Sequence, residues 1–180
     1  MSYPKITLLR GKEESLRRFH PWVFSGAIRN IEEGIEEGDT VSIVASDGSP
    51  LGVGHYQIGS IAVRMLSDRD TEIDAAFYKS RLEEAARLRS TLGLIRPDNN
   101  AFRLVHGEGD FLPGLVVDVY GSTAVVQAHS PGMHYARMII ADALLEIPGL
   151  GIKNVYYKSE TTLPYKASLD PQNDYIRGSY

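Results

Sequence analysis

Short apolar segments, separated at close spacing by turn residues, fill the first third of the chain. Four of them have the length and composition of β-strands: Ile6–Leu9, Val41–Val44, Leu51–Tyr56 and Ile61–Leu66. Turn-forming runs precede three of these strands, and a short helix is expected over Glu13–Phe19, ahead of Pro21. Closely spaced strands of this kind are typical of a small barrel, so residues 1–70 are predicted to form one.

A longer helix is predicted within residues 71–96, as the connection to a second unit. Asp74 is a suitable N-cap and Gly93 a suitable stop, which places the helix at about Ile73–Leu92. One apolar stripe is predicted from the helical spacing of Phe77, Leu82, Ala85, Leu88 and Leu92. The predicted solvent side carries the basic residues Lys79, Arg81, Arg87 and Arg89.

Residues 97–158 are predicted to form a compact α+β unit in the order strand, strand, strand, helix, strand. The expected elements are strands at Phe102–Val105, Leu115–Val119 and Thr123–Ala128, a helix at Pro131–Ile147 and a strand at Ile152–Tyr157. Residues 159–180 are polar and show no periodic apolar face, so they are predicted to be a linker. The predicted fold class is therefore a β-barrel followed by an α+β unit.

Composition excludes several kinds of chemistry. The 180 residues include no cysteine, which excludes disulfides, thiolate metal sites and a catalytic thiol within them. The five histidines have no ligand spacing, so no metal site is expected, and no nucleophile elbow or carboxylate pair indicates a hydrolase. No signal peptide or long apolar run is visible, which favours a cytoplasmic location and no membrane partner.

Residues 107–114 resemble a glycine-rich nucleotide loop at first sight. Such a loop must lead into a helix whose N-terminal amides face a phosphate, whereas Leu115–Val119 has the pattern of a strand. The glycines are therefore interpreted as turn residues, and Glu108 and Asp110 are expected to be solvated.

Charge is distributed unevenly along the chain. Residues 1–29 carry six basic and two acidic side chains, while residues 30–60 carry six acidic ones and no basic one. This asymmetry fits a basic face for an anionic partner, and equally fits two solvated surfaces.

Three basic residues, one histidine and the only tryptophan fall within residues 12–22: Lys12, Arg17, Arg18, His20 and Trp22. Arginines suit phosphate groups and an aromatic ring offers a stacking surface, so this mixture favours contact with nucleic acid. In the alternative interpretation, Trp22 and Phe24 anchor the barrel core and His20 caps a turn. For Phe24 the core position is favoured.

Two long segments of this sequence resemble a known family. The first is Gly11-Lys12 followed by SLRRFHPWVFSGAI at residues 15–28, and the second is RLVHGEGDFLPGLVVDVYG at residues 103–121. Both closely resemble the class I S-adenosylmethionine-dependent 23S rRNA cytosine-C5 methyltransferases that begin with a PUA domain.

The resemblance implies a PUA barrel, a central α+β domain and then a Rossmann-like methyltransferase domain. Only the first two are matched, so the Rossmann-like domain is expected to be absent from this chain, with S-adenosylmethionine bound in a missing C-terminal domain. The family's cysteine thiolate, which attacks C6 of the base, has no counterpart here. The chain alone is accordingly expected to hold no cofactor, no metal and no catalytic residue, and to be inactive.

The resemblance also implies how the chain would serve the reaction. Lys12, Arg17 and Arg18 would contact phosphates of 23S rRNA, and His20 or Trp22 would lie near a base or sugar. Two alternatives remain open: a stand-alone RNA-binding adaptor without catalytic activity, and a protein-interaction module. Apolar surface left by a missing domain could also pair two copies, so a homodimer is among the expected partners.

Overall fold

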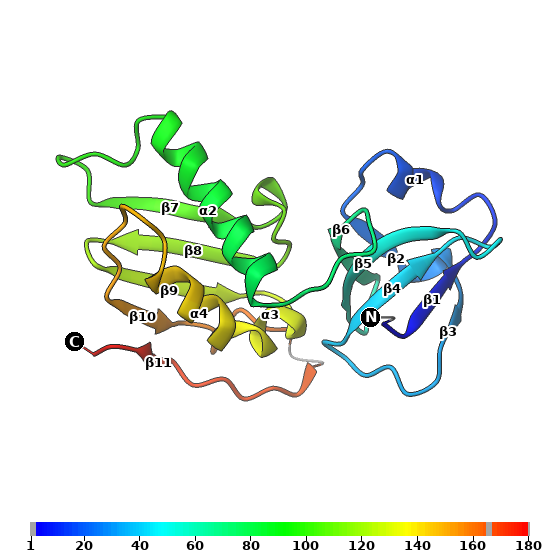
Figure 1. Cartoon of the computed structure of the whole chain (residues 1–180). Coiled ribbons are helices and arrows are strands. Elements are labelled where there is room, and N and C mark those ends of the chain that lie inside the picture. Colours follow the sequence, from blue (N-terminus) through cyan, green and yellow to red (C-terminus); the bar gives the residue numbers. More distant parts are fainter. Residues whose placement is uncertain (1–2, 165–166, 180) are drawn as a thin grey trace. The chain divides into compact units, whose positions relative to one another are not determined.

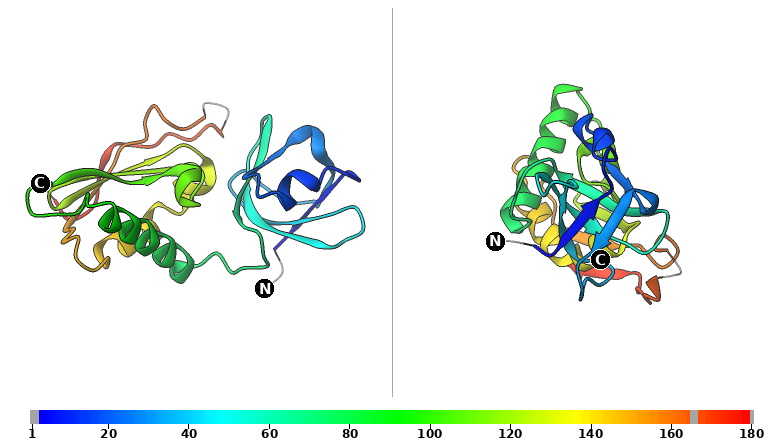
Figure 2. Two further views of the ribbon diagram at one scale, coloured as in Figure 1. Left: turned by 90° about the horizontal axis from the view of Figure 1, so that it is seen from above. Right: turned by 90° about the vertical axis from the view of Figure 1, so that its right-hand side faces the viewer.

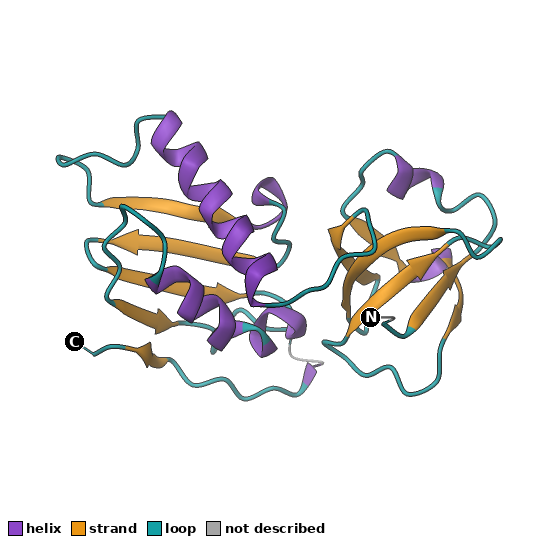
Figure 3. Ribbon diagram, in the orientation of Figure 1, coloured by secondary structure: helices purple, strands orange, loops and turns teal. Residues whose placement is uncertain are grey.

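The computed structural model describes residues 3–164 and 167–179, which divide into two compact units, Met1–Glu72 and Ile73–Tyr180 (Figure 1). Each unit has its own sheet, and most of the helical residues lie in the second (Figure 3). None of the helices described here combines the length and the apolar character that a membrane crossing requires.

Unit 1 is built on one mixed six-stranded sheet in the order β2-β6-β5-β4-β1-β3. The strands are β1 (Lys5–Leu8), β2 (Trp22–Phe24), β3 (Ile28–Ile31), β4 (Thr40–Val44), β5 (Pro50–Tyr56) and β6 (Ile61–Ser67). The pairing of β1 with β4 is parallel, and the other neighbours are antiparallel. The short helix α1 (Glu14–Arg17) lies between β1 and β2, and a 3₁₀ turn, η1 (Ser25–Ala27), joins β2 to β3.

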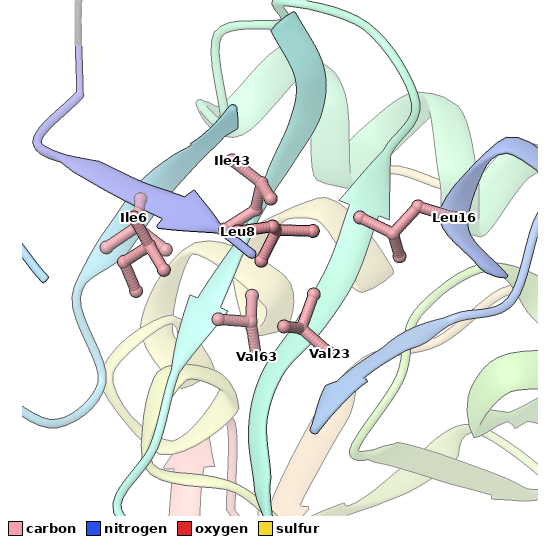
Figure 4. Close-up of a cluster of buried hydrophobic side chains, with 7 residues drawn as sticks. Ile6, Leu8, Leu16, Val23, Ile43 and Val63 are labelled. Carbon is pink, nitrogen blue, oxygen red and sulfur yellow. The ribbon is translucent and has the colours of Figure 1, made fainter. Parts of the chain in front are cut away.

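The core of unit 1 is a cluster of buried aliphatic side chains (Figure 4). Its members are Ile6, Leu8, Leu16, Val23, Val41, Ile43 and Val63. Leu16 is the one that comes from α1, so its burial attaches that short helix to the sheet. The strands β2 and β3 were not predicted, because they are only three and four residues long and mostly exposed or half-buried.

Unit 2 has a five-stranded sheet in the order β11-β10-β9-β8-β7, in which only β9 and β10 pair in parallel. The strands are β7 (Ala101–His106), β8 (Leu115–Tyr120), β9 (Thr123–Ala128), β10 (Asn154–Tyr157) and β11 (Asp174–Arg177). The helices are α2 (Ala75–Thr91), α3 (Pro131–Tyr135) and α4 (Arg137–Leu145), and a 3₁₀ turn, η2 (Gly107–Asp110), follows β7. Both α2 and α4 lie on one face of this sheet (Figures 1 and 2).

The residues of β8 and β9 alternate in burial, which gives the sheet one buried face. Leu115, Val117 and Val119 of β8 are buried while the residues between them are half-buried, and β9 repeats the pattern with Ala124, Val126 and Ala128. Both segments were predicted as strands, and the structure confirms them.

The buried face of α2 differs from the predicted stripe. Asp74 is the N-cap, as predicted, because its Oδ1 accepts a hydrogen bond from the backbone N–H of Phe77 at 2.9 Å. However, Leu88 and Leu92 are 46% and 63% exposed, and Arg89, predicted on the solvent side, is buried. The buried residues are Tyr78, Leu82, Ala85, Ala86 and Arg89.

Two further predictions need correction. The single helix predicted at 131–147 is divided at Ala136 into α3 and α4, and Ser130 caps α3 by accepting a hydrogen bond from Met133 N. The tail at 159–180, predicted to be a linker, contains β11, which pairs with β10. Its four residues are exposed or half-buried, so no apolar periodicity announces the strand.

Candidate nucleic-acid interface

The basic residues predicted to contact RNA lie in and around α1. Leu16 points into the core, and the two residues that follow it, Arg17 and Arg18, are exposed. Arg17 Nη1 lies 3.2 Å from Glu14 Oε1, one helical turn earlier. Lys12 precedes the helix and is also exposed. The two arginines and Lys12 therefore offer cationic groups at the surface of unit 1.

An aromatic cluster of His20, Trp22 and Phe24 lies at β2. Val23 is 2% exposed and faces the core, so its two neighbours in the strand project to the other side. The ring centroids of Trp22 and Phe24 are 6.2 Å apart at 89°, and that of His20 is 5.9 Å from Trp22 and 5.8 Å from Phe24. These are edge-on and tilted contacts of the kind that aromatic rings prefer.

Phe24 is 48% exposed, so its predicted place in the core is wrong. Because Trp22, Val23 and Phe24 are all apolar, composition does not show which side of the strand faces the core.

The ring of His20 is held by the backbone next to it. The N–H of Trp22 donates to His20 Nδ1 at 3.2 Å. The same nitrogen lies 3.2 Å from the carbonyl oxygen of Trp22, so the tautomer of the ring decides whether Nδ1 accepts or donates.

A pocket of about 460 Å³ adjoins this cluster. It is lined by Leu8, Gly11, Lys12, Ser15, Leu16, Val23, Phe24, Gly26 and Ala27. The structure thus brings Lys12 and Phe24 to one pocket, and His20 and Trp22 to the same aromatic cluster as Phe24. The side chains of Arg17 and Arg18 lie outside the pocket lining.

Phe19 is a surface residue that the sequence analysis missed. It has a φ of 63°, in the left-handed region, and is 77% exposed. Only its position beside His20 could have drawn attention to it.

Two titratable groups of unit 1 are shifted. Hydrogen bonds from Ser49 lower the pKa of Asp47, and the nearby charge of Arg17 adds a smaller effect in the same direction. Burial lowers the pKa of His55 to about 4, so this histidine is neutral at physiological pH.

In unit 2 the glycine-rich loop leads through η2 directly into β8, as predicted. The expectation that Asp110 is solvated is wrong, because its carboxylate is 7% exposed and forms an ion pair with Arg89. The loop is therefore a turn that the buried ion pair between Asp110 and Arg89 holds in place.

A polar contact that the sequence did not indicate joins α3 to β10. His134 Nδ1 and the Tyr157 hydroxyl are 2.7 Å apart, and the Arg137 guanidinium lies 5.8 Å from the Tyr157 ring centroid. Burial lowers the pKa of His134, with a further effect of the Arg137 charge, and burial raises the pKa of Tyr157. Across the described residues, no three His, Asp or Glu side chains are grouped closely enough to hold a metal ion.

Residues 6–68 match the PUA-like domain family. Over 171 residues the chain is 36% identical to ribosomal RNA large subunit methyltransferase I of Klebsiella pneumoniae, an alignment that covers 93% of this chain and 42% of that protein. The protein of the same name from Salmonella typhi is 38% identical over 144 residues, which are 79% of this chain and 36% of the relative. The chain thus spans less than half the length of these relatives.

Two solved structures share the fold. A SAM-dependent methyltransferase from Streptococcus mutans has a TM-score of 0.77 at 14% identity and covers 98% of this chain, which in turn covers 44% of it. A second methyltransferase, complexed with SAH, has a TM-score of 0.76 at 14% identity and covers 100% of this chain, with 43% of its own length matched.

These alignments correct the expectation that the chain stands apart from the methyltransferase fold. Solved methyltransferases cover 98% and 100% of this chain, so the predicted absence of the Rossmann-like domain is contradicted. The prediction that no cofactor belongs to this chain is contradicted as well, because the SAH-complexed structure matches its full length. Both expectations rested on a sequence resemblance that matched only the first two domains of the family, whereas fold similarity compares the whole backbone.

The chain therefore contains a PUA-like domain, and its sequence is related to that of proteins named ribosomal RNA large subunit methyltransferase I.

Proposed function

We propose that the protein containing this chain methylates 23S ribosomal RNA at C5 of cytosine with S-adenosylmethionine, and that the surface around α1 and β2 binds the RNA. The observation that carries the proposal is the basic and aromatic surface inside the PUA-like residues 6–68. The similarity to rRNA methyltransferases over 93% of the chain supports it.

Each residue of the surface has a role in this proposal. Lys12, Arg17 and Arg18 contact phosphates, and a phosphate beside Arg17 competes with the exposed Glu14 carboxylate for the guanidinium. His20 and Trp22 contact a base or sugar. Phe24 joins them, because its half-exposed ring lines the pocket that Lys12 also reaches.

The two units have different roles in this proposal. Residues 1–70 hold the RNA, while the helix within 71–96 and the sheet of 97–158 keep the target nucleotide in register, which raises the rate by proximity. Residues 159–180 extend that sheet through β11.

S-adenosylmethionine supplies the methyl group in this proposal. The side chains assigned to RNA have no role in holding this cofactor in the proposal. Direct binding of S-adenosylmethionine to the chain, measured by calorimetry, is therefore a separate experiment from RNA binding.

The RNA-binding assignment is tested by the salt dependence of affinity. Arg17→Ala and Arg18→Ala are each expected to weaken binding of a 23S rRNA fragment and to lower the slope of log K against log salt by about 0.7–0.9 per lost phosphate contact. Arg87→Ala, which removes an exposed arginine of unit 2, is the matched control and should leave the slope unchanged. An unchanged slope in both α1 variants contradicts the assignment.

The activity is tested with the full-length protein, unmodified 23S rRNA and S-adenosylmethionine carrying a labelled methyl group. Label recovered in 5-methylcytidine of 23S rRNA, and not in 16S rRNA, is the expected result. Label in another nucleoside contradicts the cytosine assignment alone. RNA binding without transfer of label would instead indicate an adaptor.

A further inference from the structure

Phe111 combines two unfavourable properties. Its φ of 56° places it in the left-handed region, where a bulky residue is strained. Its side chain is also 64% exposed, so the strain is not offset by burial of the ring. Glycine or asparagine would adopt this backbone at lower cost, which indicates that the ring itself has a use.

The loop that carries Phe111 is held rigidly. Asp110, the preceding residue, accepts hydrogen bonds from Arg89 and, at 2.6 Å, from the backbone N–H of His106. Leu112, the following residue, is fully buried, and its N–H donates to Gly107 O at 3.1 Å. Because both neighbours are held, the backbone at Phe111 is restrained, and its ring is exposed to solvent.

A cation lies behind this ring. The guanidinium carbon of Arg81, on α2, is 5.5 Å from the Phe111 ring centroid and 5.3 Å from that of Phe77. The guanidinium is therefore close to two aromatic rings, and its Nη1 lies 3.7 Å from Glu84 Oε2. The two ring contacts of Arg81 are within the range of cation–π attraction, and Glu84 is one further partner of its guanidinium.

We propose that Phe111 is a stacking platform for an unpaired RNA base, with Arg81 as the cation beside it. An exposed aromatic ring next to an arginine is the combination on which proteins stack single-stranded bases, because every base has a π-face. The proposal rests on the RNA-binding function proposed above and adds a second contact, in unit 2.

Unit 1 offers an independent parallel. Among the described residues, three non-glycine positions have positive φ: Phe19, Phe111 and Ser168. Two of these three are phenylalanines with most of the ring exposed, one in each unit. Strain at an exposed aromatic residue thus occurs twice in a chain with five phenylalanines.

The test uses the full chain and two RNA probes, a hairpin with an unpaired loop and a blunt duplex of the same stem. Phe111→Asn removes the ring and suits the left-handed backbone, whereas Phe111→Tyr keeps the ring. The asparagine variant is expected to lose about 5- to 150-fold in affinity for the hairpin, with little change for the duplex. The tyrosine variant should bind both probes as the parent does.

Two further readouts separate stacking from other roles. The salt slope of hairpin binding should not change in Phe111→Asn, because no phosphate contact is removed. The variant should also unfold at no lower temperature than the parent, since strain is relieved. Tyr120→Ala removes a ring of similar exposure from the β8–β9 turn of unit 2 and is the control for loss of any aromatic side chain.

Each contrary result has a distinct meaning. If Phe111→Asn binds the hairpin normally while Arg17→Ala and Arg18→Ala weaken it, the stacking proposal is wrong and the RNA-binding function stands. Equal losses for hairpin and duplex, or a marked fall in stability, would show a structural role for the ring and overturn the stacking proposal. If the parent binds neither probe in a salt-dependent way, both proposals fail.

Discussion

Arg89 and Asp110 form a buried ion pair that joins α2 to the loop between β7 and β8. Arg89 donates from both terminal nitrogens to the Asp110 carboxylate, with 2.8 Å between Nη2 and Oδ2, and its Nε donates to the carbonyl oxygen of Arg103 at 3.0 Å. With the N–H of His106 also donated to Asp110, neither charge is left without partners. The pair fixes the loop from which Phe111 projects.

Removing one charge of this pair should destabilise unit 2 strongly. Asp110→Asn leaves the Arg89 guanidinium buried without its counter-ion, at an expected cost of about 3–5 kcal/mol in the free energy of unfolding. Urea titration followed by far-ultraviolet circular dichroism measures it. Lys79→Met breaks the exposed pair of Lys79 with Glu146 and should cost far less. Similar losses in the two variants would show that the Arg89–Asp110 pair has no special structural role.

The glycines of the same loop are expected to differ in importance. Gly114 has a φ of +83°, and a Cβ there would lie 2.6 Å from Ser130 Oγ, so Gly114→Ala should cost about 1–3 kcal/mol. Gly109 lacks a positive φ and has open space around it, so Gly109→Ala should change stability by no more than about 0.5 kcal/mol. The same urea titration compares them, and equal effects would contradict this steric explanation.

His55 should make the stability of unit 1 depend on pH. Its pKa is about 4 in the folded state and about 6.5 when unfolded, so the unfolded state binds more protons between these values. Stability should therefore be complete above about pH 6.5 and fall as the pH drops towards 4, by about 3 kcal/mol at most.

Trp22, the only tryptophan, reports on unit 1 through its fluorescence during urea unfolding. His55→Gln cannot titrate, so its unfolding free energy should vary less than that of the parent between pH 4 and 6.5. Parallel pH profiles for the two proteins would show that carboxylates, and not His55, control acid unfolding.

Phe24 should matter more for binding than for stability. Truncating a fully buried phenylalanine to alanine lowers the free energy of unfolding by about 3–5 kcal/mol. Phe24 is 48% exposed, so Phe24→Ala should lower it clearly less. Phe24→Ala should also weaken RNA binding about 5-fold or more, because a stacking ring is lost. Trp22 fluorescence and RNA titration measure the two effects. A large loss of stability with unchanged RNA affinity would contradict this prediction and show that Phe24 has a structural role.

Local patterns predicted the elements whose cause is local. The strands β8 and β9 and the N-cap at Asp74 depend on residues within a few positions of each other, and the structure confirms them. The burial of Arg89 depends on Asp110, which lies 21 positions away and on another element. Helical periodicity cannot reveal this distant partner. The predicted apolar face of α2 therefore included Leu88 and Leu92, which are exposed, and left out Arg89, which is buried.

The candidate interface shows the same division. Lys12, Arg17, Arg18, His20 and Trp22 were selected because they are close in sequence, and the structure places all five in and around α1 and β2. Whether they contact RNA stays a prediction. Phe19 was missed and Phe24 was wrongly placed in the core, because exposure depends on how β2 and the end of α1 are oriented on the core, which composition does not reveal.

The pairing of β11 with β10 also has a consequence for solubility. Val155 and Tyr156 of β10 are paired with Arg177 and Tyr175, so the backbone of that strand is closed on both sides. An uncovered edge at β10 would offer its amides and carbonyls to a strand of another molecule, which is a common route to aggregation. Arg177 holds the covering strand in place through two hydrogen bonds to Asp142 of α4, at 2.5 and 2.9 Å. A short polar segment with no apolar pattern of its own thus protects the apolar sheet beside it from intermolecular pairing.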